Sequence, residues 1–539
     1  MLLSVSNLYG QVWNWAEQGY GTNVSGDDHG QDIVTDANGY SYVTGMFQDT
    51  VTFGSFTLYT VNENKNDMFL AKYNPNGNVV WVRQAGGNDA DYGLAVSLDN
   101  LGNCYVTGAF RDTAIFGTDT IYAPWSEYLF IAKYDTSGNY QWVKSTGYFL
   151  ATTNFGAGLA HDILGNTYTT GMFQDTITFD SFTLIGGGIY VAKFDLNGNC
   201  LWAVKERNEN FPSPSVNRIA VDGMGNCYIA GRFSDTLSFI TDTLIALGDG
   251  DGFIAKYNSS GLIEWARQVG GADIFSYDEV KDIITTSSGD LYVIGDFYGT
   301  GIFDNINLTS AGAADIFVSK WNTNGNIIWA KKAGGTMYDY GYGIELSFDG
   351  NLYITGSFAD SAFFDAFSLF STSYTDLYVA NYDTLGNVKY AIQSIGSTAS
   401  DEFSGSSISS DNLGNVYLIG TFQGSAILGS IPISTTGYHD ILVARINPLE
   451  NAIQELLGHQ EFKIYPNPTS QSATLEFNNS AQENLTLTVY DSQGRLIETV
   501  INIKTDKIAV EKGNLPPGLY FFQMYNESQI IFSGKLIMK

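Results

Sequence analysis

Acidic and aromatic side chains recur just before a short apolar run in this sequence, and they are the residues best suited to bind a ligand. Carboxylate oxygens are the ligands that a hard cation such as calcium prefers, and an aromatic ring offers a face on which a sugar can stack. We name these residues the acidic–aromatic set: Asp28, Asp91, Tyr92, Asp278, Asp339, Tyr340 and Asp401. The alternative, that the carboxylates only cap turns and keep the chain soluble, stays open.

Catalytic motifs are missing from the sequence. It contains no His-Glu-x-x-His zinc helix, no Gly-x-Ser-x-Gly elbow and no phosphate-binding Gly-Lys-Ser/Thr loop. The histidines are few: His29, His161, His439 and His459. We expect His161 to pack or to line a channel at the end of an innermost strand. The sequence therefore predicts a protein that is not an enzyme and has no catalytic residue. Whether it binds a metal stays unknown from the sequence.

The acidic–aromatic set belongs to a unit of about sixty residues that recurs seven times over the first 447 positions. A Gly after a Tyr and before an aromatic residue marks each copy, at steps of 63, 63, 60, 64, 61 and 64 residues: Gly45, Gly108, Gly171, Gly231, Gly295, Gly356 and Gly420. A fixed period of this size indicates a repeat architecture in which each unit packs on its neighbours. Residues that recur in every copy are usually scaffold.

Each copy reads as four short strands joined by tight Gly turns, which is the pattern of a β-propeller blade. The last copy lacks its fourth strand after Pro448, whereas residues 15–18 match the fourth strand of another copy at residues 265–268. We therefore predict an all-β protein with a seven-bladed β-propeller over residues 11–449. The N-terminal strand completes the last blade and removes the open sheet edges.

The repeat resembles a known family. The order of Asp, a Gly-Asn turn, Tyr-Val-Thr-Gly, a Phe-Ala-Lys-Tyr strand and a Gly-Asn turn before Trp is similar to the SBBP β-propeller repeat of bacterial surface and secreted proteins. The resemblance covers residues 11 to 447 and implies a propeller. It implies no single activity, because propellers serve as enzymes, lectins and docking platforms.

The last eighty or so residues carry a different pattern. After a linker at residues 450–460, alternating apolar strands with Gly turns predict a small Ig-like β-sandwich over residues 461–539. Its motifs resemble the type A sorting domain of the Bacteroidota type IX secretion system: Tyr465, Pro466, Asn467, Pro468, Gly494, Arg495, Gly518, Tyr520 and Lys535. The resemblance implies contact with the type IX secretion machinery, export across the outer membrane, and loss of the tail with release or surface attachment.

Composition limits the partners. The chain has 26 basic and 56 acidic residues, a net charge of −30, which repels nucleic acid and anionic membranes. No apolar run is long enough for a membrane helix. Residues 1–10 are similar to the end of a signal peptide, so we expect a truncated leader and a secreted or outer-membrane-surface protein. The three cysteines, Cys104, Cys200 and Cys227, are expected to be free thiols.

These observations favour a non-catalytic binding or adhesion module whose partner is an extracellular glycan or a surface protein. A glycan-active propeller enzyme with paired carboxylates in its central mouth is the first alternative, and acids at the mouth of only one or two blades would be its cue. A structural component of a surface layer is the second. Calcium is the one cofactor that the acidic–aromatic set would suit.

Overall fold

The computed structural model describes residues 13–539 except 22–25, 150–157, 174, 209–213, 273–276, 436, 448–462, 478, 480–481, 483, 492–495, 514 and 527–528. One compact unit spans Trp13–Ile446, and a second contains Asn447–Lys539. Both are built of strands, and within the described ranges no helix is long and apolar enough to cross a membrane. The predicted all-β class is confirmed. The predicted leader remnant (1–10) and linker (450–460) lie outside the described residues.

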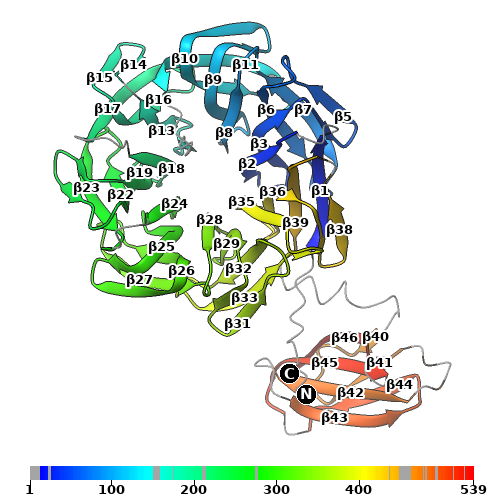
Figure 1. Cartoon of the computed structure of the whole chain (residues 1–539). Helices are drawn as coiled ribbons and strands as arrows, with labels where there is room; N and C mark the ends of the chain where they lie inside the picture. Colours follow the sequence, from blue (N-terminus) through cyan, green and yellow to red (C-terminus); the bar gives the residue numbers. More distant parts are fainter. Residues whose placement is uncertain are drawn as a thin grey trace. The chain divides into compact units, whose positions relative to one another are not determined.

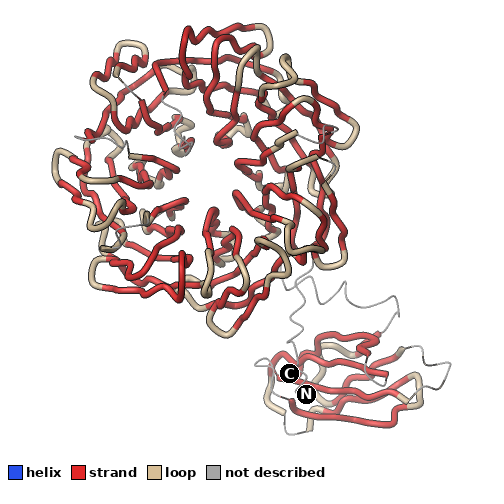
Figure 2. Tube along the Cα trace, in the orientation of Figure 1, coloured by secondary structure: helices blue, strands red, loops and turns tan. Residues whose placement is uncertain are grey.

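Each repeat of the larger unit forms an antiparallel four-stranded sheet, and Figure 1 shows the sheets side by side around a common centre. Strands and short connections account for the coloured trace in Figure 2. This is a β-propeller-like fold. Its apolar core lies between neighbouring sheets, where one cluster joins Ala109, Tyr168 and Ile229 from three successive repeats.

The strands take equivalent positions in every repeat. The innermost strands are β2 (His29–Thr35), β8 (Asp91–Leu98), β12 (Gly158–His161), β18 (Ser215–Val221), β24 (Glu279–Thr285), β28 (Asp339–Leu346) and β35 (Glu402–Ser410). The second strands are β3 (Ser41–Gln48), β9 (Cys104–Phe116), β13 (Thr167–Phe173), β19 (Cys227–Phe233), β25 (Leu291–Phe303), β29 (Leu352–Phe358) and β36 (Val416–Gln423). The third strands are β6 (Asn66–Tyr73), β10 (Asp119–Tyr134), β16 (Gly188–Phe194), β22 (Asp251–Tyr257), β26 (Ile306–Trp321), β32 (Asp376–Tyr382) and β39 (Asp440–Ile446). The fourth strands are β7 (Val79–Ala85), β11 (Tyr140–Phe149), β17 (Cys200–Asn208), β23 (Ile263–Val269), β27 (Ile327–Ala333), β33 (Val388–Gln393) and β1 (Trp13–Gly21).

A hairpin between the second and third strands links neighbouring sheets. Separate hairpins are formed by β4 (Thr50–Phe53) and β5 (Phe56–Tyr59), β14 (Thr176–Phe179) and β15 (Phe182–Ile185), β20 (Thr236–Ser238) and β21 (Thr243–Ile245), β30 (Ser361–Phe364) and β31 (Phe367–Phe370), and β37 (Ser425–Leu428) and β38 (Ile431–Ser434). In two repeats the hairpin is continuous with β9–β10 and with β25–β26. Three of the hairpins pair with an outer strand of the preceding repeat: β4 with β1, β20 with β17, and β37 with β34 (Ile395–Gly396).

A tryptophan of every fourth strand except β33, which carries Tyr390, packs over the Gly turn of the next repeat. The backbone of Gly138 has a φ of 75°, and an added Cβ there would lie 2.7 Å from the Trp81 ring. Gly325 and Trp265 have the same relation, and Trp265 Nε1 donates a hydrogen bond to Thr323 O at 3.1 Å. The repeated Trp and Gly-Asn motifs therefore form one contact between sheets.

The strand β1 takes the fourth position beside β39. The two strands pair antiparallel from Trp13↔Ile446 to Gly19↔Ile441. Trp15 of β1 donates from Nε1 to Pro75 O at 3.0 Å and packs on Gly77, as the other tryptophans do on their turns. The N-terminal strand therefore stands where the last repeat lacks a strand of its own.

The C-terminal unit consists of two antiparallel sheets that share one core. One sheet contains β40 (Lys463–Tyr465), β41 (Ser472–Glu476) and β44 (Lys507–Glu511). The other contains β42 (Leu485–Asp491), β43 (Leu496–Ile503), β45 (Gly518–Asn526) and β46 (Gln529–Met538). Leu475 of the first sheet packs with Leu487 and Phe522 of the second.

Deleting residues 1–21, and with them β1, should strongly destabilise the larger unit. The deletion exposes the edge of β39 and removes Trp15, and the loss of a buried Trp side chain alone costs about 3–5 kcal/mol. We expect the variant to aggregate or to lose its cooperative thermal transition, followed by circular dichroism and light scattering. A chain lacking only residues 1–12, which precede β1, should keep the Tm of the full chain. Equal Tm values for the two deletions would contradict the role given to β1.

Candidate functional site

The aspartates of the acidic–aromatic set are buried and accept hydrogen bonds from the backbone. Asp91 Oδ2 accepts from Gly87 N at 2.8 Å, and its Oδ1 accepts from Arg111 N at 3.4 Å. Asp278 and Asp339 make the corresponding pair of contacts in their own repeats. Each carboxylate therefore joins the loop before an innermost strand to the end of the second strand.

Asp28 and Asp401 complete the set in different ways. Asp28 is fully buried and accepts from Gln48 N at 2.9 Å. Asp401 lies two residues earlier in its repeat and caps its own loop, where it accepts from the backbone of Thr398 at 2.8 Å. Phe403 stands in register where the other repeats have the aspartate, and it stacks on Phe422 with ring centroids 6.0 Å apart. Ligand binding by these aspartates stays a prediction, because their described contacts are those of structural caps.

Burial changes the protonation of these carboxyl groups. It raises the pKa of Asp91 to about 9, against the backbone donors that lower it. The pKa values of Asp278 and Asp339 are raised to about 7 by the same cause. The pKa values of these three groups therefore lie between about 7 and about 9 rather than near 4.

The tyrosines of the set lie on innermost strands, and Tyr340 is part of a row. Tyr338, Tyr340 and Tyr342 are stacked at ring-centroid separations of 6.2 and 6.0 Å. Tyr338 is 49% exposed, whereas the other two are half-buried. Tyr92 is half-buried on β8. The row extends from the surface towards the inner part of β28.

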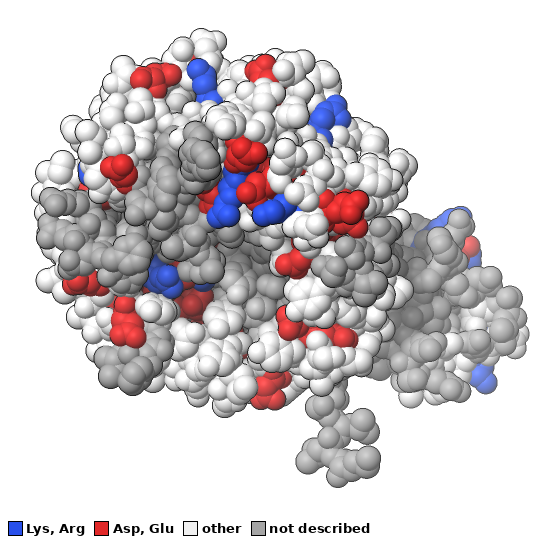
Figure 3. Space-filling view, turned by 45° about the horizontal axis from the view of Figure 1, so that its top comes forward, with Lys and Arg blue, Asp and Glu red and all other residues white. Residues whose placement is uncertain are grey.

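A polar cavity of about 230 Å³ lies at the inner end of this row. It is lined by side chains from the innermost strands of several repeats: Gln31, Leu94, Asn217, Arg218, Lys281, Tyr342, Ser404 and Ser406. Amides, hydroxyls, two cations and one aromatic ring therefore face the same space. Acidic and basic side chains lie next to each other around the hollowed centre of the face shown in Figure 3.

Arg218 ties three innermost strands together beside this cavity. Its Nη2 lies 3.2 Å from Asp32 Oδ1 of β2, and its Nε lies 3.5 Å from Asp282 Oδ1 of β24. Ser407 Oγ of β35 also donates to Asp32 Oδ1, at 2.8 Å. The guanidinium charge is therefore neutralised by carboxylates that the fold already holds in place.

Lys281 has a similar acidic environment. It forms an ion pair with Glu279, and Arg232 lies 4.0 Å from the same carboxylate. Burial lowers the pKa of Lys281, but the charges of Asp296 and Glu279 offset this and raise it. Burial also raises the pKa of Asp296 to about 7, while Lys281 and Arg232 hold that of Glu279 below its ordinary value. Asp296 Oδ1 has no hydrogen-bond partner among the described residues.

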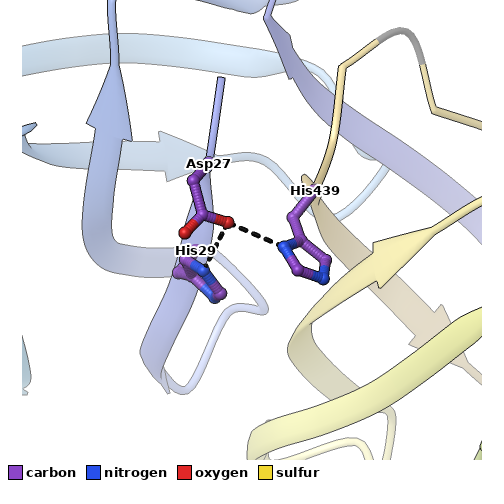
Figure 4. A group of neighbouring side chains, drawn as sticks. All are labelled: Asp27, His29 and His439. Atoms are coloured by element: carbon purple, nitrogen blue, oxygen red, sulfur yellow. Dashed lines mark hydrogen bonds and ion pairs between the residues drawn. The ribbon is translucent and has the colours of Figure 1, made fainter. Parts of the chain in front are cut away.

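A second cluster has the donor types of a metal centre. Asp27, His29 and His439 bring their ligand atoms within 4.8 Å of one another (Figure 4). Asp27 Oδ1 lies 2.8 Å from His29 Nε2 and 2.7 Å from His439 Nδ1. The hydrogen bonds from the two rings lower the pKa of Asp27. This cluster was not predicted from the sequence, although its residues differ from those at the same place in the other repeats.

The sorting-tail residues also have structural contacts. Asn467 joins the start of the C-terminal unit to β46, since its Nδ2 donates to Lys535 O at 2.9 Å and its Oδ1 accepts from Ile537 N at 2.8 Å. Tyr520 donates from its hydroxyl to Pro516 O at 2.8 Å. The predicted positions Gly494 and Arg495 lie outside the described residues. The Pro-Asn-Pro motif and the final strand therefore form one local unit.

The buried aspartates should make the stability of the larger unit depend on pH. Between about pH 4 and pH 9 the folded state holds protons that the unfolded chain has lost, so the free energy of unfolding should decrease as pH rises. Asp91→Asn should reduce this slope by up to about 1.4 kcal/mol per pH unit, the value for one proton. Urea unfolding at several pH values between about 5 and 9 measures this dependence of the free energy of unfolding on pH.

Asp135→Asn is the matched control for this prediction. Asp135 is half-buried in a turn, and the hydrogen bonds from Asn139 hold its pKa below the ordinary value. Its contribution to stability is therefore present above about pH 4 and is lost only on acidification, so its removal should leave the slope unchanged. An equal slope for Asp91→Asn and the unmodified protein would contradict the protonated state of Asp91.

Comparison with known proteins assigns the C-terminal unit. Residues 463–539 match the family described as the secretion system C-terminal sorting domain. The match covers the strands β40 to β46 and agrees with the resemblance found in the sequence. The tail is therefore a type IX sorting domain.

The chain also has a more distant relative. An uncharacterized WD repeat-containing protein, L264 of Acanthamoeba polyphaga mimivirus, is 23% identical over 507 residues, which covers 74% of this chain. This chain spans about a third (35%) of that relative's length. Since WD repeats are four-stranded blades, the relationship agrees with a propeller-like fold.

Two solved structures give only weak likenesses, each 10% identical to this chain. TcdA4 of Morganella morganii has a TM-score of 0.23 and covers 98% of this chain and 22% of its own. A GH43 protein of Bacillus licheniformis, a BlXynB mutant, has a TM-score of 0.24 and covers 98% and 91%. At these scores neither likeness bears on fold or function. The sorting domain is the feature that assigns a destination: the chain is exported by type IX secretion to the cell surface or the extracellular space.

Proposed function

We propose that this chain is a seven-bladed β-propeller of SBBP-type repeats, closed by β1, that binds an extracellular glycan without catalysing a reaction on it. Export by the sorting domain brings the propeller to the outside of the cell, where glycans are abundant ligands. The pairing of β1 with β39 and the contact of Trp15 with the first repeat support the closure.

The tyrosine row that leads into the polar cavity is the observation that carries this proposal. Tyr338, Tyr340 and Tyr342 offer successive ring faces, and the amides and hydroxyls at the end of the row can exchange hydrogen bonds with sugar hydroxyls. Stacking on an aromatic face together with a few placed polar groups is a general means of holding a sugar. The cavity is smaller than the ~300–1,000 Å³ typical of drug-sized ligands, so one sugar ring or a chain end fits it best.

The charges around the cavity favour a neutral sugar. Arg218 is paired with Asp32 and Asp282, and Lys281 is paired with Glu279. Since each cation already has a carboxylate partner, little positive potential is left to attract an acidic sugar. The net charge of −30 on the whole chain acts in the same direction.

One observation favours the enzymatic alternative. Glu279 and Asp296 are cross-strand partners beside the cavity, and their environments move their pKa values in opposite directions. A pair of carboxyl groups with separated pKa values is the pattern of an acid and a base in glycoside hydrolysis. Release of reducing sugar by the unmodified protein, lost in both Glu279→Gln and Asp296→Asn, would establish this function in place of simple binding.

Substitution of two tyrosines of the row tests the glycan proposal. We expect the purified chain to bind a neutral glycan on an array, and Tyr340→Ala and Tyr342→Ala each to weaken that binding about 10-fold or more, because each removes a stacking face. Tyr122→Ala is the control, since Tyr122 is 63% exposed on a hairpin away from the innermost strands. The array is run with calcium and again with a chelator, and loss of binding on chelation would add calcium as a cofactor.

Two results would count against glycan binding. The first is an array without signal in either condition, from protein that shows an intact thermal transition; this would favour a structural surface role or a protein partner. The second is equal binding by Tyr342→Ala and the unmodified chain, which would place the ligand outside the cavity.

Removal of the sorting domain tests the route of export. A chain that ends at residue 462, preceded by a complete signal peptide and expressed in a bacterium with a type IX system, should stay in the periplasm, because the matched domain starts at residue 463. Immunoblots of periplasmic, surface and medium fractions measure the distribution. The full chain is the control, and export of the shortened chain at the same level would contradict the role of the tail.

A further inference from the structure

Three side chains that are distant in sequence converge beside β2 and β39. Asp27 precedes β2, His29 is its first residue, and His439 directly precedes β39. Figure 4 shows the Asp27 carboxylate between the two imidazole rings. Its Oδ1 lies 2.8 Å from His29 Nε2 and 2.7 Å from His439 Nδ1.

Backbone hydrogen bonds hold the two segments together at this point. Asp28 N donates to His439 O at 3.2 Å, and Asp27 and His439 form a parallel β-bridge. His439 N also lies 3.4 Å from Gly26 O. The three side chains are therefore positioned by the sheet rather than by their own contacts.

The fold does not require these residue types. The same parallel bridge recurs between other repeats, where it joins Gly250 to Tyr277 and Thr375 to Glu402. Those pairs have no histidine. In a repeat protein, residues demanded by the fold recur in each copy, so two histidines and an aspartate at one junction alone call for another explanation.

The donor set points to a particular class of metal. Two imidazole nitrogens and one carboxylate oxygen suit zinc or a similar first-row divalent ion, whereas calcium takes oxygen ligands. At zinc–ligand distances of about 2.0–2.2 Å, tetrahedral donors lie about 3.3 Å apart, so the carboxylate needs to move by about half an ångström from its hydrogen-bonded position.

A second carboxylate lies at ion-pair distance from the other ring nitrogen of His439, beyond the length of a hydrogen bond. Glu402 Oε2 lies 3.9 Å from His439 Nε2, on the side of the ring away from Asp27. A histidine that binds a metal through one nitrogen usually gives its other N–H to a carboxylate, which fixes the ring. Asp27 and His29 are 43% and 26% exposed, so a metal ion can reach the site from solvent and keep an open coordination position.

We propose that Asp27, His29 and His439 form a zinc site between the first and last repeats, with Glu402 as the positioning residue of His439. The site joins the segment that follows β1 to the start of β39. Bound zinc would hold the two ends of the repeat array together. This effect on closure rests on the proposed function, whereas the zinc site itself does not. It is independent of the cavity and of any glycan.

Metal titration of the full chain tests the proposal. Protein stripped with EDTA should take up one zinc ion per chain, measured by calorimetry and elemental analysis, and its Tm should rise with zinc concentration. Cobalt should give the visible absorption of a low-symmetry site. His29→Gln and His439→Gln should each weaken zinc binding by more than the ~10–100-fold that outer-shell changes cause, and Glu402→Gln should fall within that range.

His161→Gln is the matched control. His161 is a histidine outside the cluster, and its ring contacts Ser97 and Thr167 at 2.8 and 3.2 Å. Its replacement should leave zinc stoichiometry unchanged even where it lowers the starting Tm. Asp27→Asn, which keeps the size of the side chain and one oxygen, provides a further variant if a histidine substitution does not fold.

Three results would overturn the proposal. They are zinc uptake well below one ion per chain, equal zinc affinity in His29→Gln and the unmodified protein, and a Tm that responds to calcium but not to zinc. The first would leave the cluster as a hydrogen-bonded His–Asp–His group alone. Failure of glycan binding with intact zinc uptake would refute the proposed function and leave the zinc site standing.

Discussion

The packing of a tryptophan on the glycine turn of the following repeat is the contact on which the larger unit depends. Trp81 lies so close to Gly138 that a Cβ there would be 2.7 Å from its ring, and the positive φ of that turn independently favours glycine. The contact joins residues more than fifty positions apart, so no single repeat is complete without its neighbour. Trp15 makes the same contact with Gly77, and β1 thereby becomes the neighbour that the last repeat needs.

The repeated carboxylates also have a structural role. A tight loop between a fourth strand and the next innermost strand leaves backbone N–H groups that need partners, and a buried aspartate supplies them in several repeats. Asp91 and Asp339 show the arrangement, with two backbone donors each. The recurring aspartates thus accept hydrogen bonds from the loop backbone. The residues that remain available for a ligand are those that do not recur from repeat to repeat.

Periodicity was sufficient to predict the strand order and the placement of β1, because each strand position repeats its Tyr, Lys, Trp or Gly. The candidate sites were harder to predict. Tyr340 was named from the sequence as an aromatic residue of the loop before an innermost strand, and it lies on β28 itself. Its partner Tyr342 and the cavity residues Arg218 and Lys281 carry no motif. Their proximity arises only when inner strands from different repeats converge, which spacing along the chain does not reveal. His29 and His439 were noted as rare residues, yet 410 positions separate them in sequence.

Two of the places where this chain departs from its own pattern have a physical origin. Side chains of several repeats converge at the innermost strands, where unlike residues such as Arg218 and Asp32 pair through opposite charges. The junction of β1, β2 and β39 joins segments from opposite ends of the array, where a repeat cannot supply its own fourth strand. A site built from residues on both sides of that junction forms only when the two segments lie together. A ligand bound there stabilises the assembled form and not the open chain, since its donors come together only in the former.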